Sequence, residues 1–380
     1  MKIVYWSKPS YADCDFPLIK ALRQEGHDVL YLMRLAPFMR KTTLIDIDRM
    51  DARNTVIRAA SYPQLTAWSD YIDLDNSYVS NDTVGTTGIR SFRLFLEEMR
   101  LINAFRPDVV HHVGIPFVFH LFLLWKYRKK SICVIHDPLP HSGESKLRNK
   151  LKLGVLGRYV KKFVLLNDKQ TSTFCEAWHI SPAHVYTASL GVYDCYRRYL
   201  TGNRIGGSPY ILFFGRISPY KGIEFAVEAF LNCHKKHSDI RLIIAGAGEQ
   251  YFSLPEKEDS IVFIHRYLTV HEIADFVSQA LFVVCPYTDA TQSGVILTSL
   301  ALGTPVLATR VGDFEQVLSD GENGWLVRPR DAAALTASFQ FLLDHPQVIG
   351  QAKERIRVMN TDDAHSWNHI ARRYFEIYKS

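Results

Sequence analysis

Short apolar runs alternate with amphipathic segments along the whole chain. Near the start, an apolar run at residues 2–6 is followed by a helical pattern at 18–25, which Gly26 closes, and by a second apolar run at 28–33. This strand–helix–strand order predicts a parallel sheet, because parallel neighbours need a crossover between them. The first part of the chain continues with predicted strands at 108–113, 131–135, 163–166 and 185–188.

The second part repeats the alternation more regularly. Apolar residues at helical spacing predict helices at 223–237, from Asp331 onward and at 366–378. The predicted strands lie at 210–214, 240–245, 261–264, 281–285, 305–308 and 324–327. A stretch rich in glycine and polar residues at 203–209 separates the two parts.

These patterns predict an α/β protein with two Rossmann-like, doubly wound domains that face each other across a cleft. We place the amino-terminal domain at 1–203 and the carboxy-terminal domain at 204–363. The last segment, 364–380, is predicted to form a helix that packs back toward the first domain. The apolar segment 115–125, which His120 interrupts, is predicted to be a core helix.

Composition adds limits on location. The chain has 380 residues, of which 47% are hydrophobic and 22% charged, so two domains can each bury a core. Its net charge of +6 suits an anionic ligand or an anionic membrane face. No apolar run reaches the roughly 18–20 residues that span a bilayer, and a first strand at Lys2 leaves no room for a signal peptide. The six cysteines form no CxxC pair, which is typical of reduced thiols in a cytoplasmic protein.

The loop after the predicted strand at 210–214 carries two cations. Arg216 and Lys221 lie in the sequence GRISPYKG at residues 215–222. Open α/β sheets bind ligands at this end of their strands. A guanidinium and an ammonium beside a helix start suit a diphosphate group. An ordinary solvated loop is the alternative from this loop alone.

Two further turns follow predicted strands of the same domain. Gly246 and Gly248 come after the strand at 240–245, where glycine permits either the close approach of a ligand or a tight turn. Residues 291–295, Thr-Gln-Ser-Gly-Val, open a helix whose free N–H groups can bind an anion, with a simple capped helix as the alternative. Because all these loops follow strands of one sheet, we expect them to face one crevice.

Histidines end two strands of the first domain. His136 ends the strand at 131–135 at the edge that faces the cleft, where its imidazole can hydrogen-bond a sugar hydroxyl or transfer a proton. The alternative is a structural histidine held by Asp137. His111 and His112 end another strand and are interpreted as packing or loop residues.

No metal site is predicted. DxD patterns at 46–48 and 73–75 lie in polar, irregular segments away from the phosphate-binding features, and are interpreted as solvated charges. No cysteine and histidine have the spacing of zinc ligands.

A basic segment runs from Lys146 to Lys162 and interleaves its cations with leucine and valine. An amphipathic helix of this kind can lie on an anionic membrane surface, and an ordinary basic surface helix fits equally well. No platform of aromatic and basic residues accompanies the charges, so nucleic acid is not predicted as a partner.

Together, these motifs resemble those of GT-B glycosyltransferases, specifically the large family 4 of retaining enzymes. The resemblance is strongest over residues 210–327. It rests on the loop at 215–222, on Gly-Ala-Gly at 246–248, on Gly-Thr-Pro-Val-Leu-Ala-Thr at 303–309 and on Gly-Glu-Asn-Gly-Trp-Leu-Val at 321–327. Weaker matches lie at 106–111, at 136–137 and at Gly191.

The resemblance implies roles for particular residues. Arg216 and Lys221 would hold the diphosphate of a nucleotide-sugar donor, and His136 would reach the donor sugar, which makes these three the predicted catalytic residues. The acceptor would lie near residues 7–15. No metal or other cofactor is implied, because the cations supply the positive charge. The implied donor-binding residues are Gly215, Arg216, Lys221, Gly246, Gly248, Gln292, Ser293, Gly294, Val295 and Thr298.

Two features depart from the family pattern. Family members usually carry two glutamates that flank seven residues, and here those positions fall near Ala290 and Thr298, or at Thr291 when the frame is shifted by one. The loop at 7–15 also lacks the usual paired glycines. The candidates to replace the missing glutamates are Gln292, Ser293 and Asp289.

The sequence therefore predicts a cytoplasmic retaining glycosyltransferase, either free in the cytoplasm or peripheral at the inner face of the membrane. It would transfer a sugar from a nucleotide-diphosphate sugar to a saccharide or lipid-linked acceptor, in the synthesis of surface polysaccharide, lipopolysaccharide or glycolipid. Two alternatives stay open, and the missing glutamates motivate the first of them. One is a non-catalytic, sugar-nucleotide-binding partner of another transferase, and the other is a GT-B epimerase or phosphorylase.

Overall fold

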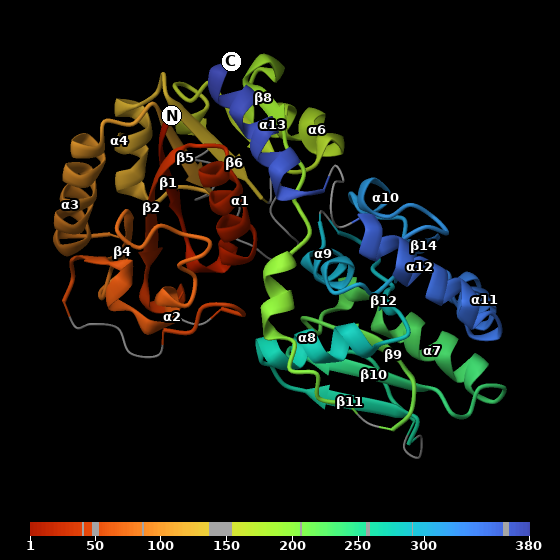
Figure 1. The fold of residues 1–380 in the computed structure, drawn as a ribbon. Coiled ribbons are helices and arrows are strands. Elements are labelled where there is room, and N and C mark those ends of the chain that lie inside the picture. Colours follow the sequence, from red (N-terminus) through yellow and green to blue (C-terminus); the bar gives the residue numbers. More distant parts are fainter. Residues whose placement is uncertain are drawn as a thin grey trace. The chain divides into compact units, whose positions relative to one another are not determined.

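The structure is a computed structural model that describes residues 1–39, 42–47, 53–85, 87–136, 154–205, 207–255, 259–290, 292–359 and 365–380. Its residues divide into two compact units (Figure 1). The first unit comprises Met1–Gly191 and Trp367–Ser380, and the second comprises Val192–Ser366.

Within the described residues, the first unit contains an eight-stranded sheet of order β3-β4-β2-β1-β5-β6-β7-β8. All neighbouring strands are parallel except β3 and β4. Strands β5, β6 and β7 are buried at every residue, as in a parallel sheet covered on both faces. The strands are β1 (Lys2–Ser7), β2 (Asp28–Leu35), β3 (Val56–Arg58), β4 (Ser77–Asn81), β5 (Val109–Val113), β6 (Ser131–Ile135), β7 (Phe163–Leu165) and β8 (Val185–Thr187).

The last helix of the chain belongs to the first unit and lies against α1 (Figure 1). The Tyr378 hydroxyl lies 2.8 Å from His111 Nδ1, and Lys162 Nζ donates to the carbonyl oxygens of Ile377 and Tyr378 at 2.9 and 3.0 Å. The helices of this unit are α1 (Ala12–Gln24), α2 (Pro63–Thr66), α3 (Ile89–Phe105), α4 (Val118–Lys126), α6 (Thr171–Trp178) and α13 (Trp367–Lys379).

His111 and His112 are packing residues, which confirms that interpretation. Both are fully buried, and their rings stack on Tyr5 and Trp6 with centroids 4.2 and 4.3 Å apart. Burial lowers the pKa of His111 to about 3 and that of His112 well below its ordinary value, so both imidazoles are neutral at physiological pH.

The second unit contains, in its described residues, a six-stranded parallel sheet of order β11-β10-β9-β12-β13-β14. Its strands are β9 (Tyr210–Phe214), β10 (Arg241–Gly246), β11 (Ile261–His265), β12 (Val283–Cys285), β13 (Val306–Thr309) and β14 (Gly324–Val327). Its helices are α7 (Ile223–His234), α8 (Val270–Gln279), α9 (Gly294–Ala301), α10 (Phe314–Val317), α11 (Ala332–Asp344) and α12 (Pro346–Met359).

Both sheets have a switch point, where the chain changes the direction in which it adds strands. In the first sheet this point lies between β1 and β5, and in the second between β9 and β12. Ligands of doubly wound proteins bind outside the carboxyl ends of the strands at such points. The fold therefore offers one candidate binding edge in each unit.

The chain enters the second unit through a 3-10 helix at Asp194–Tyr199, which packs against α8 and α9. Arg197 Nε donates to the carbonyl oxygen of Ala301 at 2.6 Å, and the Thr201 N–H donates to Asp275 at 2.9 Å. These bonds attach residues 192–203 to the second unit. The boundary between the two units therefore lies after Gly191, ahead of the glycine-rich stretch at 203–209 where the sequence placed it.

The structure confirms the predicted α/β class with two Rossmann-like sheets, and corrects several elements. β4 and α3 were not predicted, since β4 has the polar sequence Ser-Tyr-Val-Ser-Asn although it is mostly buried. Helix α1 begins at Ala12 rather than 18 and contains Pro17. The core-helix prediction for 115–125 is wrong in part, because α4 leaves Val118, Phe122 and Trp125 exposed.

Candidate functional site

Two glycine turns pack against each other at the carboxyl ends of β9 and β10. A Cβ atom on Gly246 would lie 1.7 Å from the carbonyl oxygen of Gly215, and one on Gly248 would lie 2.1 Å from that of Ile217. Backbone packing therefore accounts for both glycines of the Gly-Ala-Gly turn. The contact fixes the loop that carries Arg216 to the neighbouring strand.

Lys221 lies near the switch point, between the ends of β9 and β12. Its side chain is only 8% exposed, and its Nζ lies 3.7 Å from the centre of the Tyr287 ring and 5.0 Å from that of Tyr220. These contacts are cation–π interactions. Gly222, with φ of 62°, closes the turn, and a Cβ there would lie 2.1 Å from the carbonyl oxygen of Pro286. The loop therefore holds the ammonium group close to the end of β12.

Burial lowers the pKa of the Lys221 ammonium to about 8, with Arg216 adding to the effect and Cys285 opposing it. No carboxylate among the described residues forms a salt bridge with it. Arg216 itself is exposed. The site thus holds a partly desolvated cation that an anion can neutralise.

The pKa of Lys221 predicts how anion binding depends on pH. Affinity for a nucleoside diphosphate should be constant between about pH 7 and 8 and fall above pH 8, because the cation loses its proton there. The fall should approach about tenfold per pH unit. Calorimetric titration across this range measures it. Lys221→Met should abolish the dependence, and an unchanged pH profile in that variant would contradict the assignment.

The stability of the unliganded protein should change with pH in the opposite direction to the affinity for the anion. Because the folded pKa of Lys221 lies below its unfolded value of 10.5, the unfolded chain binds more protons between about pH 8 and 10.5. The contribution of this group to the free energy of unfolding therefore rises with pH across that window.

Helix α9 begins at Gly294, directly after the end of β12 and its following turn. The first N–H groups of a helix lack carbonyl partners in the preceding turn and carry the positive end of the helix dipole. Ser293 is 7% exposed, and Gln292 has a buried side-chain Nε2 without a hydrogen-bond partner among the described residues. Thr298 lies one turn into α9 and is 3% exposed, while Thr291 lies outside the described residues.

Tyr287 joins the cationic loop to the helix start. Its ring contacts the Lys221 ammonium, and its hydroxyl lies 3.5 Å from Ser293 Oγ. On the same edge, a Cβ on Gly215 would lie 3.4 Å from Val295 Cγ2. The structure therefore brings together the predicted residues at 215, 221 and 293–295. Sequence reasoning missed Tyr287, although its place after a buried strand of the same sheet is a usable signal.

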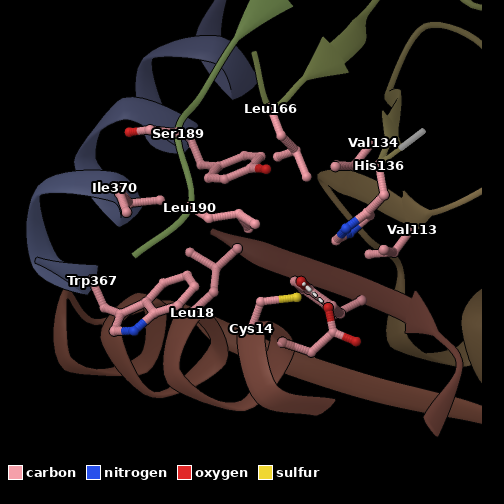
Figure 2. Close-up of a pocket in the computed structure, with 13 residues that line it drawn as sticks. Cys14, Leu18, Val113, Val134, His136, Leu166, Ser189, Leu190, Trp367 and Ile370 are labelled. Atoms are coloured by element: carbon pink, nitrogen blue, oxygen red, sulfur yellow. Dashed lines mark hydrogen bonds between the residues drawn. The ribbon is translucent and has the colours of Figure 1, made fainter. Parts of the chain in front are cut away.

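The corresponding edge of the first unit holds His136. This residue follows β6 and is half-buried, with its ring stacked on Tyr11 at 4.1 Å and an interplanar angle of 21°. Figure 2 shows the ring directed toward a pocket of the same unit. Asp137, the alternative partner, lies outside the described residues. The other residues that line the pocket include Cys14, Leu18, Val113, Val134, Leu166, Ser189, Leu190, Trp367 and Ile370.

The segment 7–15, predicted to lie near the acceptor, includes the buried carboxyl group of Asp15 at the start of α1. The hydroxyl groups of Ser7 and Tyr5 donate to Asp15, the second at 2.7 Å. Burial raises the pKa of Asp15 well above its ordinary value and that of Asp13 to about 7. Asp13 was not singled out from the sequence, because nothing in its neighbours indicates burial.

Several predicted features fall outside the described residues or have other partners. Residues 146–153 of the basic segment are not described, whereas Lys162 is bonded to the end of α13. Asp73 accepts hydrogen bonds from the Asp75 N–H and the Asn76 side chain, as in a turn. Among the described residues, no three His, Cys, Asp or Glu side chains are grouped to hold a metal ion. No described helix has the length and apolar character needed to cross a bilayer.

Residues 208–345 match the family model "Glycosyl transferases group 1". This part of the chain is therefore similar to group 1 glycosyltransferases. The matched residues contain the loop at 215–222, β12 and α9, so the match covers the whole cationic site. It confirms the resemblance to family 4 glycosyltransferases that the motifs predicted.

Relatives and solved structures extend the comparison. The D-inositol 3-phosphate glycosyltransferase of Pseudarthrobacter chlorophenolicus is 32% identical over 184 residues, which are 45% of this chain but only 43% of that relative. The glycogen synthase of Mycobacterium tuberculosis is 24% identical across 95% of this chain and 88% of its own length. The structure of Anabaena Alr3699/HepE with UDP and glucose covers 99% of both chains at 15% identity, with a TM-score of 0.67. The likeness to this structure shows that a GT-B fold spans the chain and includes the residues that match the family model.

Proposed function

We propose that this protein is a retaining glycosyltransferase. It transfers a sugar from a nucleoside-diphosphate sugar to a saccharide or lipid-linked acceptor in the synthesis of surface polysaccharide, lipopolysaccharide or glycolipid. The observation that carries the proposal is the buried ammonium of Lys221, which forms no salt bridge with a carboxylate of the described residues and lies beside the start of α9, in the segment that matches the group 1 model. A solved structure of similar fold, Anabaena HepE, contains UDP and glucose, which supports a nucleotide-sugar donor.

In the proposed reaction, the bond from the anomeric carbon to the diphosphate oxygen breaks. The acceptor hydroxyl oxygen forms a new bond on the same face of the sugar, and its proton passes to an oxygen of the leaving diphosphate. Negative charge then develops on the leaving diphosphate. Lys221 and Arg216, with the N–H groups at the start of α9, stabilise that charge without rearranging. His136 keeps its predicted role toward the donor sugar, and residues 7–15 remain the proposed acceptor region.

The first experiment is a thermal-shift screen of UDP, ADP, GDP and dTDP against the corresponding monophosphates. A diphosphate present at about 100 times its Kd stabilises the native state by about 2.7 kcal/mol, which raises the melting temperature of a unit of this size by roughly 5–10 °C. The matching monophosphate should give a much smaller shift, because it carries one phosphate fewer for the cations. Equal shifts, or none with any nucleotide, would refute a diphosphate site.

The second candidate function is a sugar-nucleotide-binding partner without turnover. It is favoured by the sequence itself, since neither Ala290 nor Thr298 supplies the acidic side chain that family members usually carry. Incubation of the selected nucleotide sugar with acceptor mixtures, followed by detection of free nucleoside diphosphate, separates the two. Tight donor binding without any release would favour the partner.

A further inference from the structure

Helices α3 and α4 carry an apolar surface that the described residues of their unit leave exposed. Six large apolar side chains are between 38% and 65% exposed on these two helices. On α3 they recur three and four residues apart, and on α4 four and three, so each set lies on one side of its helix. We call this surface the apolar face, and it consists of Ile89, Phe92, Leu96, Val118, Phe122 and Trp125.

The two halves of the apolar face adjoin each other. α3 and α4 are in contact and lie side by side in the first unit (Figure 1). The rings of Phe92 and Phe119 lie 5.3 Å apart, those of Phe95 and Phe122 6.3 Å apart, and those of Phe122 and Trp125 5.5 Å apart. A contiguous aromatic surface of this kind marks an interaction site rather than ordinary scattered exposure.

Positive charge surrounds the apolar face. Arg93 and Arg100 are exposed on α3, and the Arg128 guanidinium lies 5.8 Å from the Trp125 ring. The two glutamates of α3 do not offset these cations: Glu98 is buried against Arg34 and His120, and Glu97 accepts bonds from Thr55 and Val56. The other exposed cations of the two helices and the turn after α4 are Arg90, Lys126, Lys129 and Lys130.

We propose that the apolar face docks this protein on a bilayer that contains anionic lipids. Exposed tryptophan and phenylalanine flanked by arginine and lysine are the combination that binds to the interfacial region of anionic membranes. Two copies of this chain joined face to face would instead bring the same cations together, which disfavours a symmetric dimer. The proposal is independent of the donor site, because α3 and α4 belong to the first unit.

The position of α4 in the first unit links the proposed docking to acceptor binding. α4 follows β5, and its first turn therefore starts at the carboxyl edge of the first sheet, beside the switch point between β1 and β5. Lys8, in the loop after β1, donates to the carbonyl oxygen of Ile115 at 3.3 Å just ahead of α4. If the acceptor binds near residues 7–15, as proposed above, a lipid-linked acceptor would reach it from the same surface.

Tryptophan fluorescence tests the docking directly. Of the six tryptophans, Trp125 is 49% exposed, Trp325 is partly buried, and the other four are at most 9% exposed. Vesicles of phosphatidylcholine with phosphatidylglycerol should shift the emission to the blue, and brominated lipid should quench it. Both effects should be lost in Trp125→Phe and be absent with phosphatidylcholine alone.

Vesicle flotation with matched variants is the second test of the docking. The double variant Phe122→Ser/Trp125→Ser should bind anionic vesicles at least roughly tenfold more weakly than the wild type, whereas Tyr267→Ser/Phe341→Ser, which removes two exposed aromatics from the second unit, should bind normally. Arg93→Glu/Arg100→Glu should also weaken binding, and high salt should release the wild type. Equal flotation of all variants, or self-association through this face without vesicle binding, would overturn the proposal.

The outcome is separable from that of the proposed enzymatic function. The flotation variants should keep the wild-type nucleotide-induced thermal shift. If the wild type floated with anionic vesicles but showed no nucleotide-induced thermal shift, the membrane-docking proposal would be supported and the proposed donor site would be refuted.

Discussion

Replacing Lys221 with methionine is expected to weaken the binding of a nucleoside diphosphate by roughly 10- to 150-fold. Methionine has a similar length and fills the space against Tyr287, but it cannot donate a charged hydrogen bond to phosphate. Turnover of the nucleotide sugar should fall by at least as much, because the negative charge on the diphosphate grows as the bond to the sugar breaks. Calorimetry for the diphosphate and a nucleotide-release assay measure the two effects.

The same variant should fold as well as the wild type or better. In the unliganded protein, the side chain of Lys221 is only 8% exposed, and its ammonium has no carboxylate partner among the described residues. Burying this unpaired charge costs free energy, and methionine removes that cost. Lys235→Met is the matched control, since Lys235 is exposed at the end of α7. A variant at 221 that melts normally and binds the diphosphate as tightly as the control would refute the assigned role.

Replacing Gly246 with alanine is expected to destabilise the second unit by about 3 kcal/mol or more. The added Cβ would meet the backbone oxygen of Gly215 at 1.7 Å, and neither side of this contact is a flexible side chain that could rotate away. The carboxyl ends of β9 and β10 would have to separate. For a unit of this size, the melting temperature should fall by roughly 6–12 °C, which calorimetry can follow.

Gly350→Ala is the control for this change. Gly350 lies within α12 and is exposed, and its added Cβ would meet nothing within 4 Å. Alanine there should raise stability by about 0.5–1 kcal/mol, because glycine is unfavourable inside a helix. If the two substitutions proved equally mild, the close approach of Gly215 and Gly246 would be wrong.

Local patterning was sufficient to predict the fold class. The apolar runs that became β1, β5, β6 and most strands of the second sheet are buried on both faces, so hydropathy alone marks them. β4 escaped prediction because its side chains are largely polar and find partners across the sheet: Arg34 on β2 donates to the hydroxyl of Ser80 at 3.0 Å. Partners that are distant in sequence leave no local signal.

For the candidate site, the sequence likewise predicted some features and not others. The order of strands and loops placed Arg216, Lys221 and the start of α9 on one edge, since the carboxyl ends of parallel strands share that edge. The burial of Lys221 could not be predicted, because the Tyr287 ring that covers it comes from the far side of the switch point. The exposure of α4 was likewise hidden, since an apolar helix at the surface and one in the core have similar sequences.

The return of α13 to the first unit has a consequence for how such proteins can exchange parts. Residues 192–366 form one uninterrupted stretch of sequence, whereas the first unit is encoded in two pieces on either side of it. A recombination event that replaces the second unit therefore needs two breakpoints, one near 191 and one near 367. A single crossover after residue 191 would also replace the segment whose Tyr378 meets His111, and would leave the remaining unit with a foreign or missing terminal helix.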